Sequence, residues 1–258
     1  MAESAKTPRQ SGHVGYSRRL STATWTTSLV VLACLAFIAV EIHHIIEQRN
    51  YVLSTGKKEN ANLTSSLLQH AELTFRTADA LLIAAVFRLE HAPLDPENQK
   101  LLKSWFVQEV QHSPQFSSFA VVDSTGAMLI NSTDAPATAT FTDREYFVHH
   151  RSHSDHELYI DAPIRGRTTE GWLIPVSRRF NRADGTFGGV VIATINPRYF
   201  QRFYEGLEIG RNGAILLASL DGKILVRRPF VDANVGRDLS QGGIFQQLKT
   251  SPMGSIEL

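Results

Sequence analysis

The feature that most restricts this chain is an uncharged, mostly apolar run from Trp25 to Val40, which further isoleucines extend to Ile46. As an α-helix these roughly 22 residues would measure about 33 Å, enough to cross a hydrocarbon core of about 30 Å. A cleaved signal peptide would have a shorter apolar core and a small-residue cleavage site, and no such site follows this run. The sequence therefore predicts one uncleaved transmembrane helix over residues 25–46.

The residues before this run are polar and basic. Residues 1–24 contain four Lys or Arg residues and one acidic residue, Glu3. Because basic flanking residues stay on the cytoplasmic side of a membrane, we expect a cytoplasmic tail over residues 1–24. Everything after Ile46 would then lie outside, which for a bacterial chain means a single-pass protein of the inner membrane with a periplasmic region.

The composition narrows the classes of function. The 258 residues are 43% hydrophobic and 20% charged, with a formal net charge of +1, so the chain can bury one or two ordinary cores. This balance argues against nucleic acid as a partner, which would favour a strongly basic face. The one cysteine, Cys34, lies inside the apolar run, and a disulfide framework and a cysteine-based metal site are therefore excluded.

Helical periodicity follows the apolar run, with residues such as Leu63 and Leu67 recurring every three or four positions. We expect a long helix over residues 47–91 that either carries a signal toward the membrane or serves only as a stalk. Two prolines end this helix, and residues 97–112 have the pattern of a second, shorter helix.

Strand patterns dominate the rest of the chain, and residues 141–194 are its central stretch. A short amphipathic helix is expected at the start of this stretch, followed by two β-rich segments. The segments meet at Ala183-Asp184-Gly185, and Asp-Gly between apolar runs is the strongest short signal for a hairpin. The stretch is also rich in arginine, histidine and aromatic residues, a composition suited to holding an anionic ligand.

Two further hairpins resemble each other. Each consists of an apolar strand, a polar turn that ends in Gly and a second apolar strand. Their glycines, Gly126 and Gly222, lie 96 residues apart. This spacing indicates two copies of one module rather than a solenoid of short repeats. The second copy lacks matching central strands before residue 258.

An ordered series of motifs carries a family resemblance: D-R-E-Y-F-x-x-H-R from Asp143, W-x-I-P-V-S-R-R from Trp172, D-G-x-F-G-G-V-V from Asp184, Y-F-x-x-F-Y from Tyr199 and G-x-x-G-A-I-L-L-x-S-x-D-G-K-I-L from Gly210. This series resembles the double Cache domains, also called PDC sensors. More narrowly, it is similar to the type that precedes bacterial diguanylate cyclase (GGDEF) domains. The resemblance covers roughly residues 47–258.

The resemblance implies an α/β (α+β) fold. One transmembrane helix would be followed by a long N-terminal helix and PAS-like modules built on antiparallel sheets. Residues 92–205 would form the membrane-distal module, and residues 206–258 would form an incomplete membrane-proximal module. Family members complete the second module and continue through a second transmembrane helix into an output domain, so we expect this chain to be truncated within its second module.

The function implied by the resemblance is that of a membrane-anchored extracytoplasmic sensor. It would be the input region of a bacterial signal-transduction protein, with a diguanylate cyclase as the expected output and a histidine kinase or chemoreceptor as the alternative. The expected ligand is a small anionic metabolite such as an amino acid or organic acid. No G-x-S-x-G, H-E-x-x-H or phosphate-binding glycine motif occurs, and we expect neither enzymatic activity nor a cofactor.

Five residues are predicted to bind the ligand. The resemblance places Arg144 and Tyr146 on the helix that borders the pocket, where an arginine could grip a carboxylate through two charge-assisted bonds. Trp172 and Arg178 are six residues apart and would share one strand face if no bulge intervenes at Pro175, whereas Arg179 would point to the other face. His149 completes the set. The predicted ligand-binding residues are therefore Arg144, Tyr146, His149, Trp172 and Arg178. Surface pairing of Arg144 with a neighbouring acid, and packing by Trp172, are the competing interpretations.

His149, His153 and His156 form a weaker candidate set. On one continuous helix they would share a face and could bind zinc, which would suit a periplasmic metal-dependent enzyme. However, Ser152 and Asp155 favour a loop after the helix, so a solvated histidine-rich loop is the favoured interpretation and no metal is expected.

The expected partners are a carboxylate-bearing small molecule, the inner membrane and a second copy of the chain. A homodimer would form through the long helix of residues 47–91. A further hypothesis gives the chain no ligand at all: it would be a structural anchor or decoy that dimerises with full-length sensors.

Overall fold

The computed structural model describes residues 22–133, 140–167, 171–248 and 250 of the chain. The predicted basic tail at residues 1–24 therefore lies almost entirely outside the described residues. The chain divides into two compact units, residues 1–60 and residues 61–258. One helix, α1 (Thr22–His91), begins in the first unit and ends in the second.

The described part of the first unit is one helical segment whose apolar side chains face outward. Leu29, Leu32 and Phe37 are 71%, 70% and 66% exposed. Of the described helices, α1 alone is long and apolar enough to cross a membrane. Gly56, which could have weakened the helix, lies inside it without interrupting it, and the long helix predicted after the apolar run is therefore confirmed.

The second unit contains a six-stranded antiparallel sheet, with strand order β2-β1-β6-β5-β3 and with β4 also paired to β5. Its strands are β1 (Phe116–Asp123), β2 (Met128–Asn131), β3 (Tyr159–Ile160), β4 (Ile164–Arg165), β5 (Trp172–Asn181) and β6 (Phe187–Ile195). The turn between β5 and β6 has Gly185 at a φ of 80°, which a glycine adopts without steric cost. The hairpin predicted from Asp-Gly is thereby confirmed.

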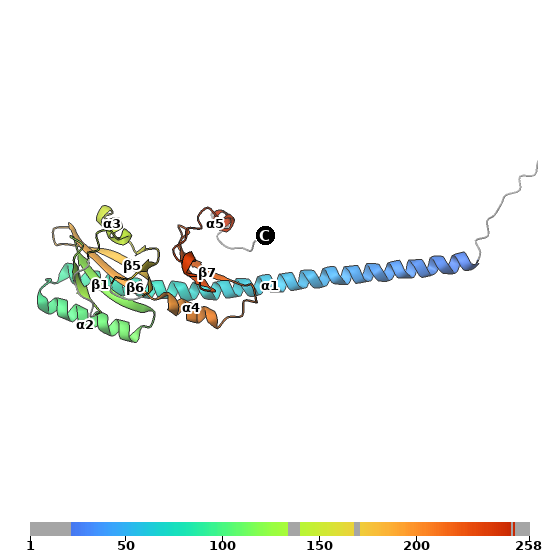
Figure 1. Cartoon of the computed structure of the whole chain (residues 1–258), viewed down its shortest axis with the longest axis horizontal. Coiled ribbons are helices and arrows are strands. Elements are labelled where there is room, and N and C mark those ends of the chain that lie inside the picture. Colours follow the sequence, from blue (N-terminus) through green and yellow to red (C-terminus); the bar gives the residue numbers. More distant parts are fainter. Residues whose placement is uncertain (1–21, 134–139, 168–170, 249, 251–258) are drawn as a thin grey trace, which may run out of the picture. The chain divides into compact units, whose positions relative to one another are not determined.

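Helices cover both faces of this sheet (Figure 1). The C-terminal part of α1 and helix α2 (Pro96–His112) pack on one face, where Ala78, Leu82 and Ala85 are fully buried. Helix α3 (Glu145–Ser152) packs on the other face, with Phe147 fully buried. Successive side chains of a strand point to opposite faces, so β5 sends alternate residues to the α1 side and the α3 side.

Capping residues fix the helix that follows the two prolines. Asp95 is the N-cap of α2, and its side chain accepts a hydrogen bond from the backbone N–H of Asn98 at 2.8 Å. Pro96 occupies the first helical position, where no backbone donor is needed. The predicted second helix over residues 97–112 therefore begins one residue early and ends where expected.

The chain then forms a smaller group of elements: α4 (Pro197–Glu205), β7 (Ile215–Ala218), β8 (Ile224–Arg228), the 3-10 helix η1 (Asp232–Asn234) and α5 (Gly243–Leu248). Strands β7 and β8 pair only with each other among the described residues. Phe200 and Tyr204 of α4 are buried with Leu225 and Val226 of β8 in the same hydrophobic core that α1 lines. The two groups of elements thus share one core.

Candidate functional site

The sheet face beneath α3 contains a small cavity, here named the distal cavity. Its volume is about 40 Å³, enough for water but not for a larger ligand without movement of its walls. Strands β1 and β6 form its floor, and α3 and the segment around β4 form its sides. The lining residues are Ser118, Ala120, Val122, Met128, Phe141, Arg144, Tyr146, Ile164, Gly166, Arg167, Leu173, Pro175, Ile192 and Thr194.

Arg144 reaches this cavity from the start of α3. It is the N-cap residue, with an extended backbone (φ −76°, ψ 137°) and no side-chain cap bond. Its Nη2 donates to the backbone carbonyl of Arg165 at 3.2 Å, while its Nε is buried and has no hydrogen-bond partner among the described residues. A buried donor without a partner costs about 1–3 kcal/mol, and more when it is charged. An acceptor in the cavity would remove that penalty.

Tyr146 lies two residues further along and is only 3% exposed. Burial raises the pKa of its hydroxyl above the ordinary value, so the side chain is neutral. Together, Arg144 and Tyr146 line the same cavity. The prediction that these two residues belong to one site is consistent with this placement, although their role in binding stays a prediction.

Asp161 is a buried acid that was not among the predicted site residues. Its backbone N–H donates to the carbonyl of Pro175 at 3.0 Å, so it continues strand β3 beside the cavity wall. It is 3% exposed, and burial, assisted by the charge of Glu145, raises the pKa of its carboxyl. The alternation Tyr159-x-Asp161 after a strand start was the signal that could have identified it.

Arg167 forms the outer wall of the distal cavity. Its guanidinium grips both carboxylate oxygens of Asp143, at 3.0 Å and 2.6 Å, and also donates to the carbonyl of Thr140. The side chain is 35% exposed, and the bidentate bond holds the pKa of Asp143 below its usual value. Arg167 thus ties two loops together over the cavity.

Trp172 lies outside the distal cavity. Its indole N–H donates to Asp232 Oδ1 at 2.7 Å, and the Arg165 guanidinium lies 4.5 Å from the centre of its ring. Arg178 lies on the opposite face of the sheet from α3, where its Nε bonds to Asp79 of α1 at 2.5 Å. The structure therefore does not bring Trp172 and Arg178 together with Arg144 and Tyr146.

Arg179 is the arginine of this pair that points toward α3. Its guanidinium donates to the carbonyls of His150 and His153 at the end of α3 and lies 5.1 Å from the centre of the Phe187 ring. A cation at this position stabilises the unsatisfied carbonyls of a helix C-terminus. The expectation that at most one of the two arginines faces the pocket side is confirmed. That arginine, Arg179, bonds to the C-terminus of α3 and does not line the distal cavity.

A bulge at Pro175 was the condition under which Trp172 and Arg178 would lose a common face. The register of β5 with β6 is regular at Pro175, and its shift lies between Phe180 and Asn181 instead. Side chains along β5 therefore alternate regularly between the two faces, and Trp172 and Arg178 lie on the same face. Sequence reasoning could establish this parity but not which face would carry the cavity.

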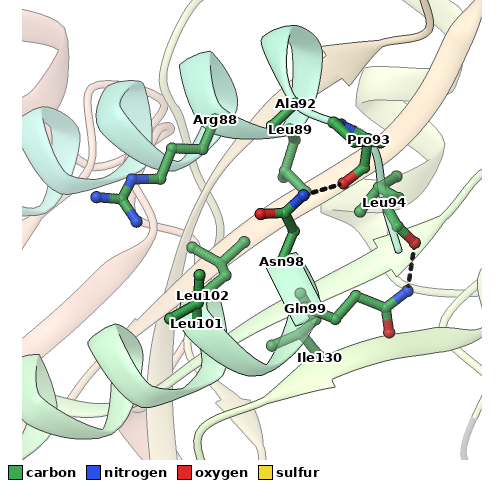
Figure 2. Close-up of a pocket in the computed structure, with 10 residues that line it drawn as sticks. All are labelled: Arg88, Leu89, Ala92, Pro93, Leu94, Asn98, Gln99, Leu101, Leu102 and Ile130. Atoms are coloured by element: carbon green, nitrogen blue, oxygen red, sulfur yellow. Dashed lines mark hydrogen bonds between the residues drawn. The ribbon is translucent and has the colours of Figure 1, made fainter. Parts of the chain in front are cut away.

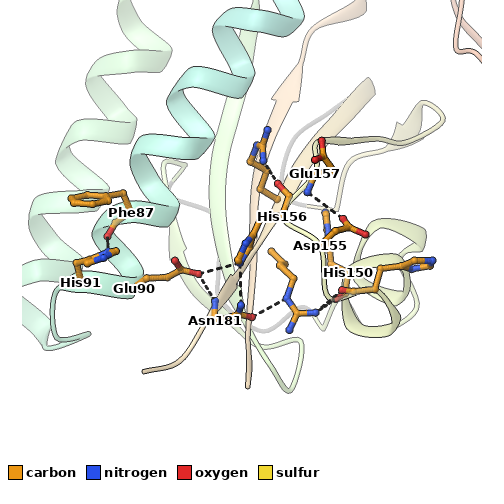
Figure 3. Close-up of polar contacts among 11 residues, drawn as sticks. Phe87, Glu90, His91, His150, Asp155, His156, Glu157 and Asn181 are labelled. Carbon is orange, nitrogen blue, oxygen red and sulfur yellow. Dashed lines mark hydrogen bonds and ion pairs between the residues drawn. The ribbon is translucent and has the colours of Figure 1, made fainter. Parts of the chain in front are cut away.

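The three candidate metal ligands do not converge. Helix α3 ends at Ser152, and His149 stacks on His153 and Tyr159 with ring centres 4.3 Å and 4.1 Å away. His156 lies instead near Glu90 of α1, at 3.5 Å (Figure 3). Within the described ranges no three His, Cys, Asp or Glu side chains are grouped to hold a metal ion. The loop interpretation is correct because the helix stops before the third histidine.

A shallow pocket of about 240 Å³ lies between the end of α1 and α2 (Figure 2). Its two amide side chains already donate to the backbone, Asn98 to the Pro93 carbonyl at 3.0 Å and Gln99 to the Leu94 carbonyl at 2.8 Å. The remaining walls are mostly leucine and proline. These amides therefore hold the connection between the two helices and are not free to select a ligand.

The long helix, the antiparallel sheet and the helices on its two faces define the class of sensor domains with PAS-like modules. A family described as histidine kinase sensor domain, of the dCache_1-like type, matches residues 197–256. The extracellular domain of rpHK1S-Z16, a protein described as a histidine kinase, is 35% identical, with 75% of this chain and 79% of that chain covered and a TM-score of 0.66.

Two more distant solved structures have the same fold. The ligand-binding domain of the Pseudomonas aeruginosa amino acid chemoreceptor PctC, solved with GABA, is 18% identical, with coverage of 72% and 79% and a TM-score of 0.50. An extracellular ligand-binding receptor from Desulfohalobium retbaense is 17% identical, with coverage of 75% and 35% and a TM-score of 0.55. No protein with a curated description matches the chain. Because the rpHK1S-Z16 domain is 35% identical over most of both chains, this chain belongs to the double Cache family of extracellular sensor domains.

Proposed function

We propose that this chain is the input region of a membrane-anchored signalling protein and that its distal cavity binds a small amino acid. The carboxylate of the ligand would bond to Arg144, and its ammonium group would lie at Asp161. The observation that carries this proposal is the buried, unpartnered Nε of Arg144 at the wall of a cavity. The apolar residues of the cavity floor would contact the ligand side chain.

The electrostatic balance of the site supports a zwitterion. Arg144 supplies a permanent positive charge, since a guanidinium is not deprotonated in proteins. Asp161 supplies a buried carboxyl whose pKa is raised by burial, and an ammonium group beside it would restore its negative charge. A ligand with both charges satisfies both groups, whereas a plain carboxylate satisfies only one. The distant relative PctC was solved with GABA, which also carries an amine and a carboxylate.

The size of the cavity requires that binding opens it. Its volume of about 40 Å³ is too small for an amino acid. Arg167 is the wall residue best placed to move, because its side chain is partly exposed and its partners, Asp143, the Thr140 carbonyl and the Phe141 ring, all belong to one short segment. We infer from this small volume that the cavity is closed in this arrangement and that Arg167 swings outward to admit the ligand.

The test is thermal unfolding of the full chain in lipid nanodiscs with three classes of probe. The classes are amino acids, the same carboxylates without the amine, and alkylamines. We expect stabilisation by an amino acid, a loss of at least about ten-fold in affinity in Arg144→Ala, and a selective loss of amino acid binding in Asp161→Asn. Arg151→Ala, an exposed arginine on the same helix, is the matched control. Stabilisation by amines alone, or a wild-type response in Arg144→Ala, would disprove the proposal.

The orientation in the membrane is also a proposal. The basic residues before Trp25 and the extracellular location of the 35% identical relative support an N-terminus in the cytoplasm of a bacterium and a periplasmic sensor region. Fusions of alkaline phosphatase and of a fluorescent protein at Leu258 test this: we expect phosphatase activity only. Fluorescence without phosphatase activity would show that Leu258 lies in the cytoplasm and would contradict the proposed orientation.

The output of the signal is the third part of the proposal. Both the matching family and the 35% identical relative are associated with histidine kinases, so we propose a kinase as the output and retain the diguanylate cyclase as an untested prediction. We propose residues 92–205 and 206–258 as the two modules, and a homodimer through α1. Ligand binding can shift such a dimer only by favouring one arrangement over another.

A further inference from the structure

A second and much larger opening lies where the two modules meet, here named the inter-module cleft. Its volume is about 600 Å³, which falls within the range of about 300–1,000 Å³ typical of small-molecule sites. One side comes from β1, β4 and β5, another from the start of α4, and a third from the segment after β8. The residues used in the argument are Arg165, Trp172, Arg198, Gln201, Phe230 and Asp232.

An aromatic surface is held firmly in this cleft. Trp172 donates its indole N–H to Asp232 Oδ1 at 2.7 Å, and the same oxygen accepts from Arg165 at 2.9 Å. The Arg165 guanidinium lies over the Trp172 ring. These three contacts fix the indole between the modules without covering the cleft, and Phe230 adds a second ring that is 51% exposed. Both rings can stack against a flat apolar ligand.

Two polar side chains near these rings have no partner among the described residues. Arg198 at the start of α4 is exposed, and no described residue accepts a hydrogen bond from its guanidinium; its backbone N–H bonds to the Asn196 side chain at 3.0 Å. Gln201, one turn later, likewise has no side-chain partner within the described part of the chain. Among the described lining residues, two arginines face one acid, Asp232. Arg165 and Asp232 form an ion pair and offset each other, so the cleft has a net positive charge of one, which is that of Arg198.

We propose that the inter-module cleft is a second binding site, separate from the distal cavity, for a small organic anion that joins a carboxylate to an aromatic ring. The carboxylate would bond to Arg198 in the bidentate manner that a guanidinium favours. The ring would lie against Trp172 and Phe230, and Gln201 would offer an amide donor. Because Trp172 and Phe230 come from different modules, a bound ligand would bridge them.

Benzoate is the probe for this proposal. Acetate is the control that lacks the ring, and benzylamine is the control that lacks the negative charge. The full chain, labelled with 5-fluorotryptophan, is held in nanodiscs, and the fluorine resonance of Trp172 is assigned from Trp172→Phe. We expect millimolar benzoate to shift that resonance and acetate to bind at least about ten-fold more weakly. Benzylamine should leave the resonance unchanged.

Four substitutions make the test specific. Arg198→Ala should weaken benzoate binding by about ten-fold, because one charge-assisted bond is lost. Arg202 is an exposed arginine of the same helix outside the cleft, and Arg202→Ala should leave benzoate affinity unchanged. Asp232→Asn keeps an acceptor for Trp172 but removes the negative charge, and should strengthen benzoate binding. Asp161→Asn, a substitution beside the distal cavity at a residue that does not line the cleft, should leave benzoate affinity unchanged, which separates this site from the distal cavity.

The contradicting results are equally definite. An unshifted Trp172 resonance at millimolar benzoate would overturn the proposal. Equal affinity of the wild type and Arg198→Ala would do the same, as would benzylamine binding as tightly as benzoate. Weaker benzoate binding in Asp232→Asn would show that the carboxylate of the ligand is not near Asp232 and Arg198.

Discussion

The hairpins β1–β2 and β7–β8 have the same pairing in very different surroundings. Val121 pairs with Ile130 in the first, and Leu217 pairs with Val226 in the second, 96 residues later in both strands. The register shifts directly after Val121 and directly after Leu217. The two turns also place their glycines at positive φ, 80° at Gly126 and 96° at Gly222.

The surroundings differ because β1 has a second neighbour. It pairs with β6 along its length, and Phe119, Val121 and Val122 are at most 1% exposed. Strand β7 pairs with β8 alone among the described residues, and Leu216 is 43% exposed. The helices that follow each hairpin differ in the same way: α3 buries three side chains, and α5 buries none.

The comparison shows that register and burial have separate causes. Register follows from the turn and from the alternation of side chains within about a dozen residues, which both copies share. Burial depends on strands and helices supplied by the rest of the fold, which only the first copy has in the described residues. The second hairpin therefore presents an open strand edge that another chain segment could pair with.

The largest expected difference concerns two core residues at equivalent positions, Phe119 and Ile215, which are 1% and 6% exposed. Phe119→Ala leaves a cavity between β1 and α2, and should lower the free energy of unfolding by about 3–5 kcal/mol. Ile215→Ala should cost about 2 kcal/mol, because its strand has one partner and its surroundings can relax. Thermal unfolding of both variants in nanodiscs measures this. Equal losses would show that the second hairpin is as tightly packed as the first.

A smaller effect concerns pH and α3. His150 is fully buried, its Nε2 lies 3.0 Å from the Ser177 hydroxyl, and burial lowers its pKa to about 4. An unfolded chain takes up this proton near pH 6.5, so the stability that the neutral ring provides is complete above about pH 6.5. It is lost as the pH falls from about 6.5 to about 4, by up to about 3 kcal/mol.

The measurement is the unfolding temperature across that pH range. His150→Gln should reduce stability at pH 7 and flatten the pH dependence below it, because glutamine does not titrate. His112→Gln, an exposed histidine of α2, is the control and should leave the dependence unchanged. Gln246 stands 96 residues after His150, so the second copy has no corresponding titration. An unchanged slope in His150→Gln would assign the pH dependence to another group.

The smallest effect separates backbone conformation from crowding at the turns. Gly185 has a φ of 80° with open space around it, so Gly185→Ala measures the conformational cost alone, about 1 kcal/mol. A methyl group at Gly222 would lie 2.7 Å from the backbone N of Ser240, and one at Gly126 would lie 2.5 Å from the Thr142 side chain. We expect losses of about 2 kcal/mol at Gly222, less at Gly126 and least at Gly185. Thermal unfolding again ranks them, and equal losses would contradict a role for crowding.

Much of the fold was predictable because its signals are local. Asp184-Gly185 determined the β5–β6 hairpin, and the prolines at positions 93 and 96 determined where α1 ends and α2 begins. Ser152 and Asp155 correctly indicated that α3 would end before His156. Each of these depends on backbone preferences that act within a few residues.

The site was only partly predictable. Arg144 and Tyr146 line one cavity, and their contact with a ligand stays a prediction. Arg178 lies on the same face of β5 as Trp172, as expected, yet its side chain bonds to Asp79, 99 residues earlier. Asp161 became a candidate only once its burial was known. Parity along a strand is a local property, but the helix that covers each face is supplied by distant segments.

By itself, the sequence determined the long apolar helix, the second helix, the hairpins, the repeated register and the family. These follow from periodicity, turn chemistry and the order of motifs along the chain. The tertiary structure alone decided that α3 and α1 cover opposite faces of the sheet, that Arg144 Nε has no hydrogen-bond partner among the described residues, and that Asp232 meets Trp172. The reason is physical: these contacts join residues far apart in the chain, and only the packing of a shared core fixes which of many possible partners each side chain meets.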